Sequence, residues 1–139
     1  MSEYVAGKRS SGTAWRESQH ALAKVYDKRG DKAKANDIYK SLSAWPATAE
    51  GAEASYRMVE AAFDAGDYDK AEKAVYAFSE SETPYSYWLA KSFLKLGDIY
   101  VVRGDSFQAR ATYQSVADGY SPADDGIVAE AREKIASLK

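Results

Sequence analysis

Three short segments of this chain share one design, in which Gly-Asp is followed by Ala after the same interval. The segments read RGDKAKANDIY, AGDYDKAEKAVY and RGDSFQARATY. Their glycines, Gly30, Gly66 and Gly104, lie 36 and 38 residues apart, which is close to the period of a repeat made of two helices. The chain is therefore expected to fold as a stack of helix pairs.

Each Gly-Asp pair has the chemistry of a tight break between two helices. Glycine adopts the left-handed conformation that ends the first helix, and the aspartate carboxylate caps the exposed amides of the next helix. Two helices joined by so short a break must fold back on each other. The small side chains of Ala35, Ala71 and Ala109 would let the two backbones approach where the helices cross.

Apolar residues recur at helical spacing on both sides of each break. Prolines just beyond the second helices close the three units, at Pro46, Pro84 and Pro122. The pattern predicts seven helices, which begin near residues 14, 31, 48, 67, 84, 105 and 124.

The residues around the breaks resemble the tetratricopeptide repeat family, whose units carry a large residue, Leu then Gly or Ala, Tyr, Gly, Ala, an aromatic residue and Pro at these steps. The resemblance is strongest in the third unit, FLKLGDIYVVRGDSFQARATY, and weakest in the second. There, Ala62 replaces the usual Tyr and Val75 replaces the aromatic residue of the second helix. The resemblance implies an all-α, right-handed superhelical solenoid with helix pairs at about 14–46, 48–83 and 84–121.

The two ends of the chain differ from the repeats. The C-terminal segment predicts a capping helix over about 124–138, with Asp124 and Asp125 as caps at its start. Residues 1–13 are rich in Ser, Gly and Lys, so we interpret them as a flexible or foreign start that precedes a repeat domain over 14–139. The apolar face of the capping helix is expected to consist of Ile127, Ala131, Ile135 and Leu138.

The run TPYSYWLAKSFLKLGDIYVVRGDSFQA is also similar to the final repeat of long repeat proteins of the bacterial cell envelope. This similarity implies a periplasmic or envelope location for a parent protein. An end repeat normally needs a polar outer face, and the N-terminal end lacks one, so the chain is expected to be a fragment of a longer repeat protein.

Composition argues against several classes of function. The net charge of -2 gives no basic excess for nucleic acid or an anionic membrane, and no apolar stretch is long enough to span a membrane. The chain has no cysteine and one histidine, His20, which leaves little for a metal site or a catalytic relay. No glycine-rich phosphate-binding run occurs. We therefore expect no enzyme activity, no metal and no cofactor.

Surface recognition is the remaining route to function. The first helix of the third unit is apolar almost all round, except for one polar line at helical spacing, and the same steps are polar in the other two units. In such a stack the first helices line a concave groove, which would bind a peptide or helix of a protein partner. The predicted partner-binding residues are Lys24, Lys28, Glu53, Tyr56, Arg57, Glu60, Phe63, Lys91, Leu94, Lys95 and Asp98, with Val101 as a further apolar anchor.

Three alternatives stay open on the sequence alone. The charges could be a solvated face with pairs such as Glu53 and Arg57, and the apolar flankers could pack between repeats. The rings of Trp15 and Trp45 could stack on sugars, although packing within the repeats is favoured for them. The open N-terminal end could form a homo-oligomer. The family's grip on a C-terminal carboxylate is not expected, because the lysines are present but the asparagines are absent.

Overall fold

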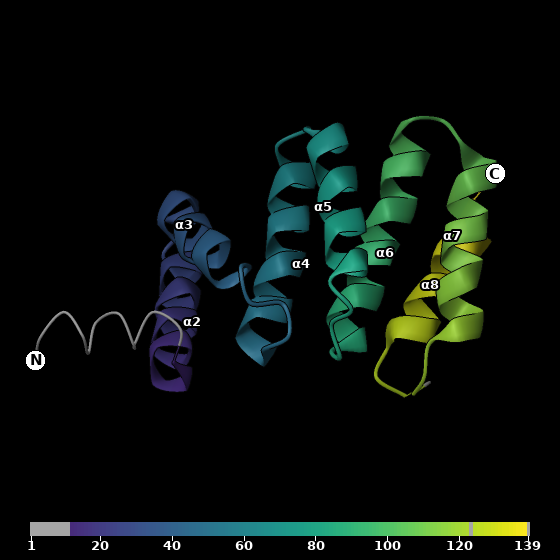
Figure 1. Ribbon diagram of the computed structural model, residues 1–139. Helices are drawn as coiled ribbons and strands as arrows, with labels where there is room; N and C mark the ends of the chain where they lie inside the picture. Colours follow the sequence, from purple (N-terminus) through teal and green to yellow (C-terminus); the bar gives the residue numbers. More distant parts are fainter. Residues whose placement is uncertain (1–11, 123, 139) are drawn as a thin grey trace, which may run out of the picture.

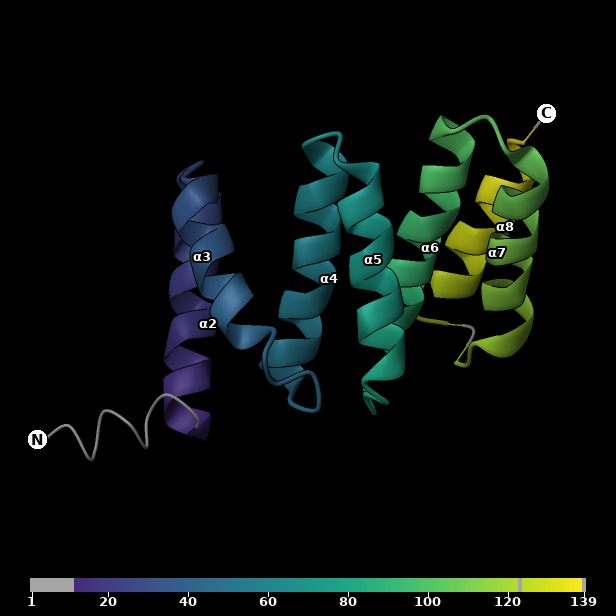
Figure 2. The same ribbon diagram turned by 45° about the horizontal axis from the view of Figure 1, so that its top comes forward.

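The computed structural model describes residues 12–122 and 124–138, and every regular element in this part of the chain is a helix. The helices form three antiparallel pairs followed by a single helix, and Figures 1 and 2 show the pairs side by side in chain order. The helices are α2 (Thr13–Lys28), α3 (Lys32–Leu42), α4 (Ala49–Asp64), α5 (Tyr68–Glu80), α6 (Ser86–Val102), α7 (Ser106–Gly119) and α8 (Ile127–Ala136). The all-helical solenoid predicted from the repeats is confirmed.

The observed helix starts can be compared with the starts predicted from the sequence. Each helix begins within three residues of its predicted start, and the largest difference is at α8. That helix begins at Ile127 because Gly126 adopts a left-handed φ of 93° and the Asp125 carboxylate accepts a hydrogen bond from the Ile127 amide at 3.2 Å. The predicted flexible start at 1–13 lies almost wholly outside the described residues, although Thr13 already belongs to α2.

The three Gly-Asp breaks share one backbone geometry. The φ angles of their glycines are 79°, 79° and 77°, a left-handed region that an L side chain rarely adopts. The aspartate after each glycine accepts a hydrogen bond from the backbone amide three residues further on, at 3.3, 3.2 and 3.0 Å. The predicted roles of both residues, as helix stop and as helix cap, are confirmed.

Small residues lie where the paired helices cross. Ala35, Ala71 and Ala109 have no exposed surface, and each belongs to the apolar cluster of its own pair. A larger side chain at these points would overpack the contact. This burial is what the expected close approach of the backbones requires, and the approach itself stays a prediction.

Side chains across each pair also compensate one another in size. Where α7 carries Tyr113, α6 carries Gly97, and a Cβ atom built on Gly97 would lie 2.2 Å from the tyrosine ring. In the second pair the aromatic residue is replaced by Val75, which shares its apolar cluster with Val59 at the step that corresponds to Gly97. The departure of the second unit from the family pattern is therefore balanced on the facing helix.

This compensation gives a stability prediction for Gly97→Ala. In an ordinary helix interior the change from Gly to Ala is stabilising, by roughly 0.5–1 kcal/mol. Here the added methyl group would meet the Tyr113 ring, so we expect a net loss of roughly 1–3 kcal/mol in the free energy of unfolding. Urea denaturation at neutral pH measures the difference.

Gly119→Ala is the matched control. Gly119 closes α7, and nothing lies within 4 Å of its Cβ position, so this variant should be as stable as the wild type or slightly more so. A Gly97→Ala protein that is as stable as the control would contradict the close contact between α6 and α7.

Candidate functional site

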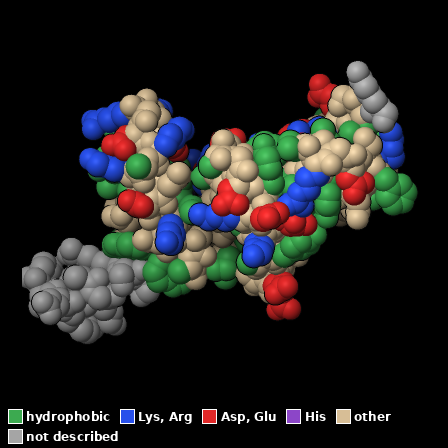
Figure 3. Space-filling model, turned by 90° about the horizontal axis from the view of Figure 1, so that it is seen from above, with side chains coloured by type: hydrophobic (Ala, Val, Ile, Leu, Met, Phe, Trp, Pro, Cys, Tyr) green, Lys and Arg blue, Asp and Glu red, His purple; other side chains and the backbone are tan. Residues whose placement is uncertain are grey.

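The predicted binding residues lie on the first helices of the pairs, α4 and α6, with two on α2. We call the surface formed by Lys24, Glu53, Arg57, Phe63, Lys95 and Asp98, together with Lys134 of α8, the inner face. Acidic and basic side chains are interspersed over the part of the molecule seen in Figure 3, without a large patch of one sign. The geometry of the inner face decides which of these groups are available to a partner.

Glu53 is the centre of a charge network between the first two pairs. Glu53 as a whole is only 5% exposed, and its carboxylate accepts hydrogen bonds from His20 Nε2 at 2.7 Å, Lys24 Nζ at 2.8 Å and Arg57 Nη2 at 3.1 Å. Burial alone would raise the pKa of Glu53, but the hydrogen bonds and charges of Lys24 and His20 outweigh burial and lower that pKa. The carboxylate is therefore held ionised between α2 and α4.

Arg57 extends this network along α4. Its Nη1 donates to Glu60 at 3.1 Å, and its guanidinium lies 5.5 Å from the Tyr56 ring centroid and 5.8 Å from that of Trp88. Burial by itself would lower the pKa of Arg57, but the hydrogen bonds and charges of Glu60 and Glu53 raise it. The pair of Glu53 with Arg57, weighed above as part of a solvated face, is present, but Glu53 is buried and not solvated.

A second set of polar contacts ties α8 to α6. Asp98 accepts hydrogen bonds from Tyr113 Oη at 2.5 Å and from Lys134 Nζ at 3.0 Å. Burial and the neighbouring Asp98 carboxylate raise the pKa of Tyr113, so the phenol stays protonated and acts as a donor. Lys91 Nζ lies 4.0 Å from Glu130 of α8. These contacts make α8 part of the inner face in the third unit.

The predicted apolar anchors differ in how accessible they are. Tyr56 is 5% exposed and Leu94 is 2% exposed, because both pack inside the stack, so the expectation that they offer anchoring surface is wrong. Phe63 is half-buried, and Val101 is 46% exposed. Only Phe63 and Val101 of the four anchors present apolar surface that a partner could reach.

Phe63 and Val101 meet at a recess on the inner face between α4, α6 and α8. Its volume is about 290 Å³. The Nζ atom of Lys95 lies 4.7 Å from the centre of the Phe63 ring, and no carboxylate of the described residues pairs with it. The recess is lined by Phe63, Asp98, Val101, Val102, Tyr113, Lys134, Ser137 and Leu138. The structure thus joins three predicted residues, Phe63, Lys95 and Asp98, with side chains of the capping helix.

Lys134 and Leu138 were not predicted to bind a partner. The helical pattern of the C-terminal segment gave Leu138 a place on the apolar face of a cap, but it did not show that this face meets the inner face of α6. Lys28 lies apart from the recess near the end of α2, where it is exposed and forms no ion pair within the described part of the chain. It is therefore the predicted residue least connected to the others.

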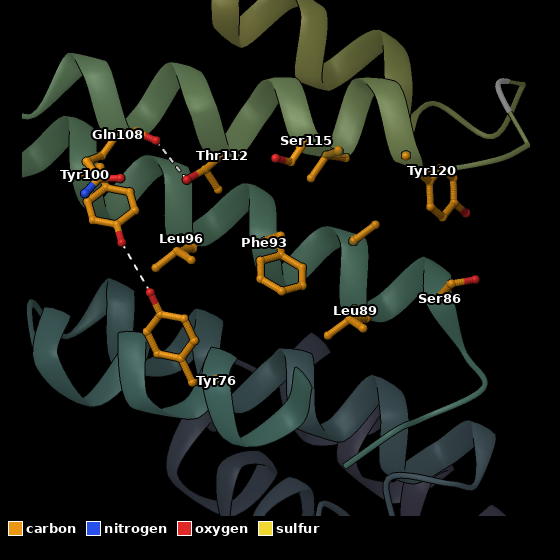
Figure 4. Close-up of a pocket in the computed structure, with 13 residues that line it drawn as sticks. Tyr76, Ser86, Leu89, Phe93, Leu96, Tyr100, Gln108, Thr112, Ser115 and Tyr120 are labelled. Atoms are coloured by element: carbon orange, nitrogen blue, oxygen red, sulfur yellow. Dashed lines mark hydrogen bonds between the residues drawn. The ribbon is translucent and has the colours of Figure 1, made fainter. Parts of the chain in front are cut away.

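A larger apolar pocket lies away from the inner face, between α5 and α7, with α6 as its floor (Figure 4). Its volume is about 500 Å³, and none of its lining residues is charged. Leu89, Phe93 and Leu96 point into it from α6, and the hydroxyls of Tyr76 and Tyr100 meet across one end at 3.3 Å. The pocket offers apolar packing surface, and its polar groups are the hydroxyls and amide of uncharged side chains.

The two tryptophans weighed as sugar-stacking residues pack on each other. The ring centroids of Trp15 and Trp45 are 5.8 Å apart in an edge-to-face arrangement, and both side chains are half-buried. Among the described residues, no group of three His, Cys, Asp or Glu side chains could hold a metal ion, and none of the helices there has the length and apolar character of a membrane span.

The network around Glu53 gives a second stability prediction. Glu53→Gln removes the negative charge but leaves the cations Lys24 and Arg57 facing each other, so we expect a loss on the order of 2 kcal/mol at pH 7. Because the pKa of Glu53 is lowered in the folded state, its contribution is present above the ordinary value of 4.5 and is lost as the pH falls through the folded value. The difference between wild type and variant should therefore shrink in strongly acidic solution.

Glu17→Gln is the control for this measurement. Glu17 is exposed on α2 and forms no ion pair with a described residue, so its loss should change the urea midpoint little at either pH. Equal stability of the Glu53→Gln and Glu17→Gln proteins at pH 7 would show that the buried network contributes nothing.

Comparison with known proteins agrees with this architecture. A family model described as tetratricopeptide repeat matches residues 17–46 and 86–121, which contain most of α2 with α3 and all of α6 with α7. No curated protein and no solved structure matches the chain significantly. The unmatched middle pair is the one that lacks the usual Tyr and aromatic residue, yet it has the same break geometry and the same buried alanine after it. Two matched helix pairs with a third of the same geometry between them place the chain in the tetratricopeptide repeat family.

Proposed function

We propose that this chain is a non-catalytic interaction module that binds a peptide or helix of a protein partner on its inner face. Tetratricopeptide repeats generally mediate protein–protein interactions, and the observation that carries the proposal here is the recess beside Lys95. It combines reachable apolar surface from Phe63 and Val101 with a cation that has no acidic partner among the described residues. Such a combination suits an apolar anchor flanked by a charge.

The chemistry of the recess suggests what the bound segment carries. Lys95 sits over the Phe63 ring, where part of its hydration is replaced by the aromatic face. An Asp or Glu side chain of the partner would pair with this ammonium, while a neighbouring aliphatic or aromatic side chain would fill the space between Phe63 and Val101. The proposed ligand is therefore an acidic residue next to an apolar one.

The charges of the first two units have a different role in this proposal. Lys24, Glu53, Arg57 and Glu60 satisfy one another within the molecule, so a partner would have to break existing hydrogen bonds to use them. We infer that they hold neighbouring repeats at a fixed angle. Recognition is then concentrated where Phe63 of the second unit meets the third unit, and the other predicted residues of the first two units support the shape of this site.

The test compares variants of the recess in binding to a library of peptides that pair acidic and apolar residues. Lys95→Glu should weaken binding roughly tenfold, mainly through slower association, because the attractive charge becomes repulsive. Val101→Asp should remove anchoring surface and weaken binding by a similar factor. Neither should shift the melting temperature much, since Val101 is exposed and Lys95 has no ion pair among the described residues.

Lys28→Glu is the matched control, because it makes the same charge change on an exposed lysine away from the recess. Its affinity for the selected peptides should equal that of the wild type. If peptides bind the Lys95→Glu and Val101→Asp proteins as tightly as the control, the recess is not the binding site.

A further inference from the structure

An apolar stripe on α2 is left uncovered by the described residues. Leu22 and Val25 are 38% and 42% exposed, and Ser18, one turn earlier on the same side of the helix, is exposed as well. Figures 1 and 2 show α2 and α3 at one end of the row of helices. Two exposed aliphatic residues in line are not unusual by themselves, so their meaning depends on what the other repeats do with the same positions.

The same positions in the other two pairs are covered. Counted back from the glycine of each break, Ser18, Leu22 and Val25 correspond to one residue triplet on α4 and another on α6. Ala54, Ser92 and Ile99 have no exposed surface, Leu96 is 4% exposed, and Met58 and Ala61 are half-buried. The stripe on α2 is therefore the repeat's stacking surface without its neighbour.

The neighbour that covers this surface elsewhere is the preceding helix pair. Leu96 and Ile99 of α6 share one apolar cluster with Ala71 and Val75 of α5. Met58 packs in the same way against the cluster of α2 and α3. Each stacking stripe thus rests on apolar residues of the pair before it, which are Ala71 and Val75 at the junction of α5 with α6.

A charge contact accompanies this apolar junction. Arg103, the residue before the glycine of the third break, reaches back to α5, where Nη2 lies 2.5 Å from Asp69 Oδ1 and Nη1 lies 2.9 Å from Glu72 Oε1. Arg29 holds the same position before Gly30 and is exposed, and no described carboxylate pairs with it. Arg29 therefore has the place of Arg103 but lacks the acidic helix that Arg103 contacts.

We propose that the outer side of α2, formed by Ser18, Leu22, Val25 and Arg29, is a docking surface for the second helix of another tetratricopeptide helix pair. The established junction gives the chemistry of that helix. It carries Ala and Val where α5 has Ala71 and Val75, and Asp and Glu where α5 has Asp69 and Glu72. In sequence terms the occupant resembles DKAEKAV, residues 69–75 of this chain.

The C-terminal end of a second copy does not meet this description. On α7 the positions of Ala71 and Val75 are held by Ala109 and Tyr113, which are buried in a cluster with Ile127 and Ala131 of α8. The position of Glu72 is held by Arg110, a cation that would repel Arg29. The occupant is therefore a helix pair outside residues 12–138, and head-to-tail stacking of this chain is disfavoured.

The test supplies such a helix pair within the full chain. A copy of residues 48–85 is inserted between residues 11 and 12, so that Gly12 follows the copied Tyr85 as Ser86 does in the third unit. Gly12 and Ser86 both stand 18 residues before the glycine of their break, and this keeps the register. The extended protein should melt as one cooperative unit at a higher temperature, and the amides of α2 should exchange more slowly with deuterium.

Two variants separate docking from a general effect of added length. Leu22→Gln with Val25→Gln should change the folding equilibrium constant of the original chain little. The same double change should lower that constant roughly tenfold or more in the extended chain. Arg29→Glu should lower the folding equilibrium constant of the extended chain roughly two- to fivefold. Lys in place of the copied Asp69 and Glu72 should restore stability to the extended Arg29→Glu chain, but should not stabilise the extended chain that keeps Arg29.

Two results would overturn the proposal. In the first, the inserted pair unfolds separately and leaves exchange in α2 unchanged. In the second, the unextended chain sediments as a dimer at micromolar concentration and Leu22→Gln with Val25→Gln makes it monomeric, which would show that a second copy is the occupant. Neither result bears on the recess beside Lys95, which lies on α6.

Discussion

The left-handed glycine at each break is the constraint on which the rest of the stack depends. With φ near 79° and an aspartate cap directly after it, the chain reverses within three residues and the next helix must lie along the previous one. That closeness admits only alanine at the crossing, and it sets the spacing at which each pair presents its outer residues. The inner face, the recess and the stacking stripes all follow from this repeated reversal.

The features that the sequence predicted correctly are those decided by residues near one another in the chain. The Gly-Asp breaks, the crossing alanines and the helix starts need only local backbone conformation and a period of about 3.6 residues. The partners of Glu53 were beyond such reasoning, because His20 lies 33 residues earlier and reaches it only through the angle between two pairs. The burial of Leu94 and the approach of Lys134 to Asp98 likewise depend on long-range packing, in this case of α6 against α7 and α8.

Two kinds of contact therefore coexist on one side of the molecule. Between the first and second pairs, the charges are satisfied internally, and the price of opening them is an uncompensated carboxylate at Glu53. Beside the third pair, α8 and the residues after it supply Lys134 and Leu138 to the recess, and Lys95 nearby has no described acidic partner. The polar groups are thus paired within the molecule between the first two pairs, whereas Lys95 beside the third pair lies over an aromatic ring and has no described carboxylate partner.

The uncovered stripe of α2 also shapes how the molecule moves. In a stack where each pair touches only its neighbours, local stability is set by the number of junctions a pair makes, and α2 with α3 make one where α4 with α5 make two. Within the described part of the chain, and without a helix pair docked on α2, opening should consequently begin at α2 and progress toward α8. The hydrogen bonds from His20 and Lys24 to Glu53 join α2 to α4, so they should slow the first step of this opening.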